Sequence, residues 1–169
     1  MPSSLSPESC TKLSRNRNSD VFIIAFFAFV AFILDQWSKS LIAKNFLPGE
    51  SKLVVHGLLR WTYEQNSHGA FGLFGSNAIL LVAMALVVLV VFWYAFRDAA
   101  RHSLLARIGF GLIVGGAIGN IVDRIQHGSV TDFIDFYRWW PNIFNVADSC
   151  ITIGVGLLLI ASLATHRRS

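Results

Sequence analysis

Three aspartates lie in one short stretch of the chain, Val130–Ser149, which reads VTDFIDFYRWWPNIFNVADS. Asp148 follows Asn145 by three residues and stands at the start of an apolar run. This spacing predicts a helix with Asn145 as its N-cap and Asp148 at its third position. The positive end of the helix dipole would favour the ionised form of Asp148. Asp132 and Asp135 are the other carboxylates of the stretch.

Two neighbouring carboxylates could share a proton, because both cannot easily ionise at close range. This is the chemistry of aspartic proteases, in which one carboxylate takes a proton from water while the other protonates the scissile carbonyl oxygen. On the residues alone, Asp132 and Asp135 compete as the partner of Asp148. The alternative is that Asp148 serves only to cap its helix.

Three further polar clusters lie outside this stretch. Asp35 and Lys39 are spaced i and i+4, so they can pair on one helix face, and we interpret that pair as structural. Glu64 is either a solvated loop residue or part of a site. The other clusters are Asn120, Asp123 and Arg124 in GNIVDR, and Glu64, Gln65 and Asn66 before the turn SHGAF.

The histidines His56, His68 and His127 do not form a ligand pattern such as His-Glu-x-x-His. We therefore expect no metal site, and we expect no cofactor. The sequence also lacks a Ser or Cys with a nearby His and Asp arrangement typical of a catalytic nucleophile.

The composition is typical of a membrane protein. Hydrophobic residues make up 54% of the chain and charged residues 14%, against about 45–50% and about 25% in soluble domains. A helix needs about 20 apolar residues to cross a bilayer. The segments that meet this need run from Val21 to about Lys44, from Ala78 to Phe96, from Ile108 to about Arg124 and from Ala147 to Ala164.

We therefore expect a mainly α membrane protein with four transmembrane helices in one domain, residues 21–166. A disordered cytoplasmic tail, residues 1–20, would precede the domain, and a cytoplasmic C-terminus, residues 167–169, would follow it. With the N-terminus inside, the inner segments carry eight basic and three acidic residues, and the outer side carries six basic and seven acidic residues. This asymmetry predicts that both termini are cytoplasmic and that the polar clusters face outward.

Three loops would join the spans. The cytoplasmic loop is expected at 97–107. The outer loop at about 47–75 is rich in β-branched and aromatic residues, which predicts a small sheet. The other outer loop, at about 126–145, contains Trp139 and Trp140, which favour headgroup depth.

The chain resembles the lipoprotein signal peptidases (signal peptidase II) from the first span to the end of the fourth. Four motifs carry this resemblance, in the family's order. They are DQWSK at Asp35–Lys39, NSHGAFG at Asn66–Gly72, GNIVDR at Gly119–Arg124 with VTDF following, and FNVADS at Phe144–Ser149.

The resemblance implies a bacterial aspartic endopeptidase that removes the signal peptide from prolipoproteins, cutting before a diacylglyceryl-modified cysteine. It implies that Asp132 and Asp148 are catalytic and that Asp135 is a loop residue. Our hypothesis is that Asp148 acts as the initial base while Asp132 carries the shared proton. The residues that match supporting or substrate-positioning sites in the family are Asp35, Lys39, Asn66, Asn120, Asp123, Arg124 and Asn145.

The resemblance also implies a small β-rich cradle in the first outer loop and a multi-pass protein of the bacterial cytoplasmic (inner) membrane. We expect a monomer whose partners are diacylglyceryl-prolipoprotein substrates and membrane lipids, with no nucleic acid. The chain departs from the family's usual Asn-x-Gly after that loop, because Asn66-Ser67-His68 precedes Gly69.

Two other functions stay open on the residues alone. A small ion or proton-coupled transporter would also carry ionisable residues within its spans. Its path would need polar residues in the second span, and Ala78–Phe96 has no charged residue. A non-catalytic assembly or lipid-binding protein would function without Asp132 and Asp148.

Overall fold

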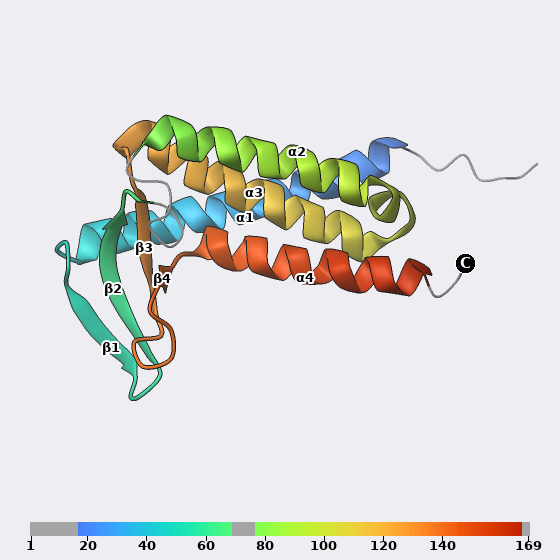
Figure 1. The fold of residues 1–169 in the computed structure, drawn as a ribbon. Helices are drawn as coiled ribbons and strands as arrows, with labels where there is room; N and C mark the ends of the chain where they lie inside the picture. The colour runs from blue at the N-terminus through green and yellow to red at the C-terminus, as the bar shows by residue number, and fades with distance from the viewer. Residues whose placement is uncertain (1–16, 69–76, 167–169) are drawn as a thin grey trace, which may run out of the picture.

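The computed structural model describes residues 17–68 and 77–166, which form four helices and four β-strands (Figure 1). In chain order these elements are α1 (Arg17–Asn45), β1 (Ser51–Val55), β2 (Leu59–Asn66), α2 (Ala78–His102), α3 (Leu104–His127), β3 (Val130–Asp135), β4 (Ile143–Phe144) and α4 (Val146–His166).

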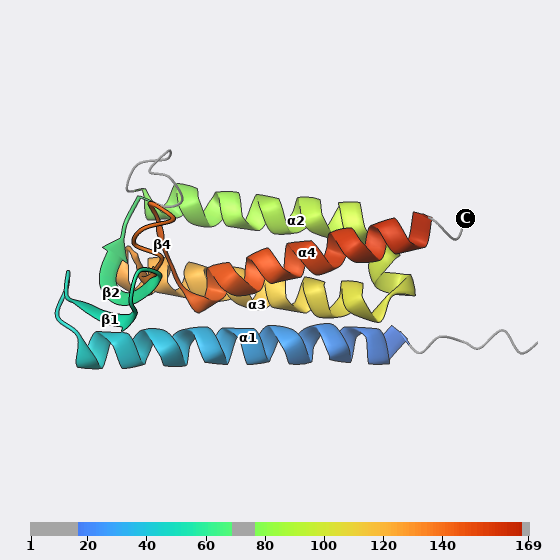
Figure 2. The same ribbon diagram turned by 90° about the horizontal axis from the view of Figure 1, so that it is seen from below.

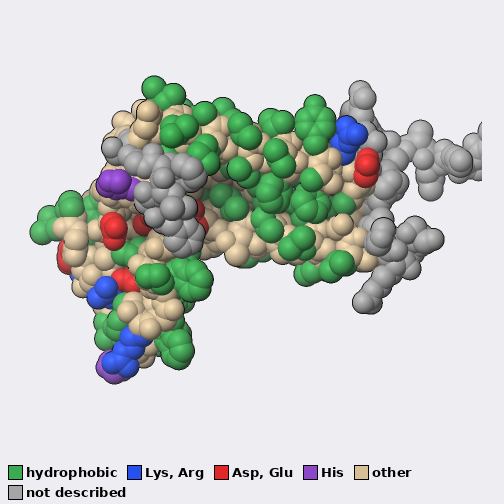
Figure 3. Space-filling view, in the orientation of Figure 1, with side chains coloured by type: hydrophobic (Ala, Val, Ile, Leu, Met, Phe, Trp, Pro, Cys, Tyr) green, Lys and Arg blue, Asp and Glu red, His purple; other side chains and the backbone are tan. Residues whose placement is uncertain are grey.

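All four helices are long and apolar enough to cross a membrane, which confirms the predicted number of spans. The spans are Ser19–Asn45, Ala78–Ala100, Leu104–His127 and Val146–Ala164. Many large apolar side chains on these helices are exposed, including Phe22 and Phe29 of α1 and Val87 and Val91 of α2. In the space-filling view, hydrophobic side chains dominate the helical part (Figure 3). In the bilayer, these side chains would contact lipid.

Helix α3 lies at the centre of the bundle, and glycines let its neighbours approach closely (Figure 2). A Cβ atom on Gly115 would overlap the backbone of Ala28 on α1. A Cβ atom on Gly116 would lie 2.5 Å from the carbonyl oxygen of Ala147 on α4. These glycines therefore let the helices pack closely, and α3 holds α1 and α4 on two of its faces.

The four strands form an antiparallel sheet in the order β1-β2-β3-β4 at one end of the bundle. The sheet crosses that end of the bundle and projects sideways beyond the helices (Figure 1). Its position confirms the predicted cradle in the segment 47–75, where β1 and β2 form a hairpin.

The pairing of β2 with β3 contains a register shift between Trp61 and Glu64. Arg60 of β2 pairs with Asp135 of β3, and Glu64 pairs with Asp132, so β2 has one more residue than β3 between these pairs. Strict alternation would place Asp132 and Asp135 on opposite faces of β3. Both aspartates nevertheless line the same cavity.

The loop expected at 97–107 is not a loop. Helix α2 continues to His102 and α3 begins at Leu104, so Ser103 alone joins them. The Ser103 N–H donates to the Ala99 carbonyl oxygen, and its hydroxyl accepts the Ala106 N–H at 3.4 Å. The charges in this segment indicate the limit of the apolar span, whereas the backbone stays helical beyond it.

Two other boundaries also differ from the predicted ones. Residues 17–20 of the expected disordered tail belong to α1, and residues 1–16 lie outside the described part of the chain. Helix α3 extends to His127 and ends at Gly128, whose φ of 72° closes it in the left-handed conformation. Both described ends of the chain lie at the end of the bundle opposite the sheet (Figure 1).

Candidate active site

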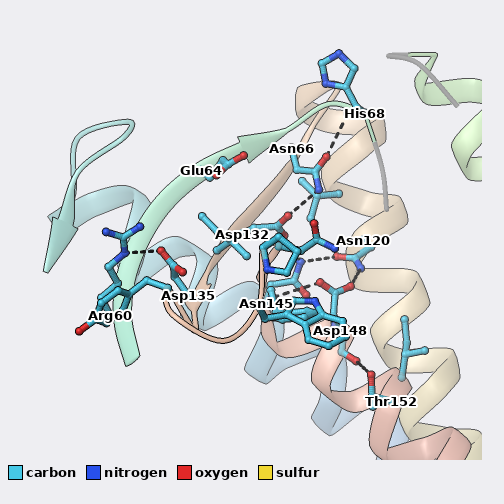
Figure 4. A pocket seen from close by; sticks show the side chains of 18 of the residues that line it. Arg60, Glu64, Asn66, His68, Asn120, Asp132, Asp135, Asn145, Asp148 and Thr152 are labelled. Atoms are coloured by element: carbon cyan, nitrogen blue, oxygen red, sulfur yellow. Dashed lines mark hydrogen bonds and ion pairs between the residues drawn. The ribbon is translucent and has the colours of Figure 1, made fainter. Parts of the chain in front are cut away.

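A cavity of about 970 Å³ lies where the sheet meets the helix bundle (Figure 4). Its walls come from β2, β3, α3, α4 and the segment before α4. Asp132 from β3 and Asp148 from α4 both line it. Other polar side chains along its wall include Arg60, Glu64, Asn66, Asn120, Arg124 and Asp135.

Asn145 begins α4 and directs a hydrogen-bond donor at Asp132. The Asp148 N–H donates to Asn145 Oδ1 at 2.9 Å, and the Asn145 N–H donates to Asp148 Oδ2 at 3.3 Å. This reciprocal pair is a capping box, so the predicted helix start is confirmed. Because a backbone N–H can only donate, Oδ1 must face α4 and Nδ2 must point away. Asn145 Nδ2 donates to Asp132 Oδ1 at 2.7 Å.

Asn120 is oriented by Lys39 in a similar way. Lys39 Nζ donates to Asn120 Oδ1 at 2.9 Å, and an ammonium group has no acceptor. The amide nitrogen of Asn120 must therefore face the other way, where it donates to Asp148 Oδ1 at 2.9 Å. Asn145 Nδ2 also lies 3.2 Å from Asn120 Oδ1. The two carboxylates are thus connected through two asparagines (Figure 4).

Asn66, at the end of β2, completes the group of asparagines. The backbone N–H of His68 donates to Asn66 Oδ1 at 3.2 Å, which leaves Nδ2 to donate to Asp132 Oδ2 at 2.9 Å. Any residue except proline supplies such an N–H, so the histidine at position 68 preserves this contact. The rest of the motif, residues 69–72, lies outside the described residues.

The environment of Asp132 favours its protonated form. Its side chain is buried, with 3% of its surface exposed. Burial and the negative charge of Asp148 raise the pKa of the Asp132 carboxyl from 3.8 to about 7, although hydrogen bonds from Asn66 and Asn145 act in the opposite direction. At neutral pH this carboxyl therefore exists in both protonation states.

Lys39 lies in a buried ionic cluster behind the two asparagines. Its Nζ is 2.7 Å from Asp35 Oδ2 and 2.9 Å from Asp123 Oδ2. Asp35 Oδ1 also accepts the Ala147 N–H at 2.8 Å, which ties α1 to the first turn of α4. The i, i+4 pairing of Asp35 with Lys39 is confirmed, and Asp123 of α3 joins it.

Arg124 places a guanidinium group beside the aspartates. Its side chain lines the cavity, and Nη1 donates to the Asn120 carbonyl oxygen at 3.2 Å. Its Nε is a buried nitrogen with no hydrogen-bond partner among the described residues. The positive charge lies close enough to Asp132 and Asp148 to interact with both.

Asp135 is not a loop residue, contrary to the expectation. It ends β3 with 3% of its surface exposed. Arg60 Nε lies 2.5 Å from Asp135 Oδ2, and the Thr62 hydroxyl donates to the same oxygen at 2.9 Å. Asp135 therefore holds the Arg60 guanidinium group at the sheet end of the cavity. Glu64 is likewise on a strand rather than in a loop, and it lines the cavity.

Sequence reasoning missed two residues of this region, Gln36 and Arg60. Gln36 Nε2 donates to Asp123 Oδ1 at 2.9 Å and so supports the buried cluster. Arg60 shares the cavity side of β2 with Glu64 and Asn66. The even spacing of these three polar residues in a predicted strand is a signal that could have found Arg60.

Within residues 17–68 and 77–166, no group of three or more His, Cys, Asp and Glu side chains is arranged to hold a metal ion. The cavity is lined by several carboxylates, Asp132 and Asp148 among them. Two aspartates and a set of oriented amide donors suit general acid–base catalysis with a water molecule.

Comparison with known proteins gives a consistent result. A family model described as signal peptidase (SPase) II matches residues 27–164. The lipoprotein signal peptidase of Syntrophomonas wolfei is 44% identical over 137 residues, which cover 80% of this chain and 89% of that protein. The lipoprotein signal peptidase of Desulfitobacterium hafniense is 40% identical over 139 residues, which cover 82% of this chain and 91% of that protein.

Solved structures share the fold as well. A bacterial membrane enzyme solved by the in meso method at 2.3 Å superposes with a TM-score of 0.73 and 30% sequence identity, covering 91% of this chain and 93% of that one. A second, solved at 1.9 Å, gives a TM-score of 0.70 with 31% identity, covering 88% of this chain and 94% of its own.

Proposed function

This chain belongs to the signal peptidase II family, and from that premise we propose that it removes the signal peptides of prolipoproteins as an aspartic endopeptidase of the bacterial inner membrane. Its catalytic pair is Asp132 and Asp148. The cut lies just before a cysteine that carries a diacylglyceryl group.

The observation that carries the proposal is the pair of aspartates in one cavity. Asp132 has a pKa raised to about 7 by burial and by the charge of Asp148. Asp148 stands at the start of α4, where the helix dipole favours a negative charge. Two neighbouring carboxylates that share one proton can act as acid and base in one reaction.

The reaction begins with Asp148 ionised and Asp132 protonated. Asp148 takes a proton from water as the water oxygen attacks the scissile carbonyl carbon, and Asp132 gives its proton to the carbonyl oxygen. In the second step the C–N bond breaks, Asp148 returns its proton to the leaving nitrogen, and Asp132 takes back the proton from the hydroxyl. One water is consumed, and both carboxyls regain their first state.

The asparagines hold the two carboxylates without neutralising them. Asn66 and Asn145 donate to Asp132, and Asn120 donates to Asp148. An amide carries no net charge, so it orients an oxygen while leaving the carboxyl free to exchange a proton. The roles of Asp35, Lys39 and Asp123 are to position Asn120 and the start of α4.

The same proposal assigns an orientation in the membrane. Arg97 and Arg107 lie near the junction of α2 and α3, at the end of the bundle opposite the sheet, where both described chain ends also lie (Figure 1). Basic residues favour the cytoplasmic side. Both termini are then cytoplasmic, and the cavity and the sheet lie at the outer face. The lipid tails of the substrate stay in the bilayer while its scissile bond enters the cavity.

Cleavage of a diacylglyceryl prolipoprotein by the purified protein tests this proposal. Wild type should cleave before the modified cysteine, and Asp132→Asn and Asp148→Asn should each lose about 100-fold or more of the turnover, as expected when one general acid or base is removed. Asp135→Asn should keep measurable turnover, because it changes a contact of Arg60 and leaves the pair intact. Wild-type turnover in either Asp132→Asn or Asp148→Asn would refute the catalytic assignment.

A further inference from the structure

Glu64 stands directly across the sheet from Asp132. The register of β2 and β3 pairs these two residues, and their side chains line the same cavity. Directly opposed residues in an antiparallel pair have Cβ atoms about 4.5–5.5 Å apart. In the close view Glu64 lies on β2 between Arg60 and Asn66, along the wall that leads to Asp132 (Figure 4). A third carboxylate therefore lies directly across the strand pair from Asp132, one of the two proposed catalytic residues.

Glu64 differs from the other charged residues of the cavity because it has no partner among the described residues. Asp135 is paired with Arg60. Asp132 and Asp148 accept hydrogen bonds from asparagines. The Glu64 side chain is exposed, and its neighbour Gln65 is held instead by Tyr63 and Thr131.

The position of Glu64 indicates which part of a substrate it would meet. The cavity is lined by Ile151 and Thr152 of α4 on the helix side and by Arg60 and Glu64 on the sheet side, with the aspartates between them. A diacylglyceryl group must stay with the helices, because only they cross the bilayer. The chain that follows the modified cysteine leaves the membrane, so it passes over the sheet.

We propose that Glu64 is a specificity-determining residue, which favours a basic side chain and disfavours an acidic one at the position just after the modified cysteine. The inference rests on the proposed function and adds a charge preference to it. A substrate ammonium or guanidinium group would pair with the free Glu64 carboxylate, whereas a substrate carboxylate would be repelled by Glu64. The pairing lies at an exposed rim, so its effect is modest.

The test uses three diacylated prolipoprotein peptides that differ only in having Lys, Gln or Glu after the modified cysteine. For wild type we expect kcat/KM to fall in that order, by about threefold per step, as for exposed ion pairs. Glu64→Gln should bring the three values together, and Glu64→Lys should reverse their order. Added salt should reduce the wild-type differences, because exposed charges are screened.

Glu50→Gln is the matched control, since it removes the same charge from the same hairpin region. Glu50 accepts the Leu47 N–H and pairs with Lys52, and it does not line the cavity. The wild-type order should persist in this variant. Equal cleavage of the three peptides by wild type and by Glu64→Lys would overturn the inference while leaving the proposed function intact. Failure of wild type to cleave any of them would instead overturn the proposed function.

Discussion

Asp35 and Asp123 share Lys39, whereas Asp132 and Asp148 are held by asparagines, although one hydrogen-bonded network contains both pairs. The network passes through a single side chain, because Asn120 accepts from Lys39 and donates to Asp148. Both pairs therefore consist of aspartates that belong to one polar network. They differ in whether a cation makes direct contact.

The difference separates a structural pair, Asp35 and Asp123, from the pair that we propose to be catalytic, Asp132 and Asp148, which is called the reactive pair below. Lys39 contacts Asp35 and Asp123 directly, so the carboxylates of this cluster are paired with a cation. No ion pair involves Asp132 or Asp148 within the described residues, and the pKa of Asp132 is raised to about 7. An amide holds a carboxylate in place without fixing its charge. The two pairs thus differ in the partner of their carboxylates, which is a lysine in one pair and asparagines in the other.

Adding a cation to the reactive pair should have the largest effect. Asn66→Lys would place an ammonium beside Asp132, where Asn66 Nδ2 now lies 2.9 Å from its Oδ2. An opposite charge at this distance lowers a carboxyl pKa by about 1–3 units, so Asp132 would lose its proton at neutral pH. We expect turnover to fall about 100-fold, the size of one lost general acid. Steady-state kinetics on a diacylated prolipoprotein would measure it.

Asn66→Met is the control for this change, because it has a side chain of similar length and no charge. It removes the same hydrogen bond and should reduce turnover far less than Asn66→Lys. Equal losses in the two variants would show that the amide contact matters and the charge does not, which would contradict the comparison.

Removing the cation from the structural pair should have the next largest effect, on stability. Lys39 is 5% exposed and Asp35 is fully buried. Taking away one partner of a buried ion pair costs about 3–5 kcal/mol. Lys39→Met should therefore lower the thermal midpoint of the detergent-solubilised protein clearly. It should also reduce activity, because Asn120 would lose the contact that orients its amide toward Asp148.

A triple variant separates charge from packing in that cluster. Lys39→Met combined with Asp35→Asn and Asp123→Asn leaves no uncompensated charge. It should recover part of the lost stability, since a neutral replacement of a whole buried ionic group is often tolerated. A triple variant that is less stable than Lys39→Met alone would contradict the role assigned to Lys39.

Much of this arrangement could be predicted from local sequence signals. The four spans follow from the length of apolar runs, and the start of α4 follows from the spacing of Asn145 and Asp148. The i, i+4 spacing of Asp35 and Lys39 likewise predicted their contact. Each of these features depends on residues within one or two helical turns of each other.

The rest depends on contacts that spacing does not encode. Asp135 lines the cavity together with Asp132, although the two residues are three positions apart on β3, and their spacing does not predict this. The addition of Asp123 to the Lys39 cluster depends on how α1 packs on α3. The polarity of residues 97–107 suggested a loop, but polarity indicates where a span leaves the apolar layer and not where its helix ends.

The pH dependence should sharpen the comparison further. Asp132 has its folded pKa raised from 3.8 to about 7, so its contribution to stability is fully present below pH 3.8 and is lost as the pH rises toward 7. The proposed mechanism needs the proton of Asp132, so kcat/KM should decline above about pH 7. Asn66→Ala removes a donor that favours the ionised form, and this should move the alkaline limb to higher pH.

Asp132→Asn is the control for the predicted pH dependence of stability. Asp132→Asn cannot ionise, so its thermal midpoint should decline less between pH 4 and 7 than that of wild type. Identical pH profiles of stability for the two proteins would contradict the raised pKa. An alkaline limb that Asn66→Ala leaves in place would mean that another group titrates there.

The smallest effect is expected at the opposite end of the bundle. Arg107 Nη1 lies 2.5 Å from Asp20 Oδ1, which joins α3 to the start of α1 outside the network of the cavity. Arg107 is buried and keeps its bond to the Ser103 carbonyl oxygen, so Asp20→Asn, which removes one charged hydrogen bond, should cost about 1.5–3 kcal/mol, less than the loss of Lys39. Thermal unfolding should show a smaller decrease than for Lys39→Met, and kcat/KM and its pH profile should stay unchanged. An altered pH profile would mean that the ion pairs of the two ends are coupled through the helices, and the separation between structural and reactive charges would then not hold.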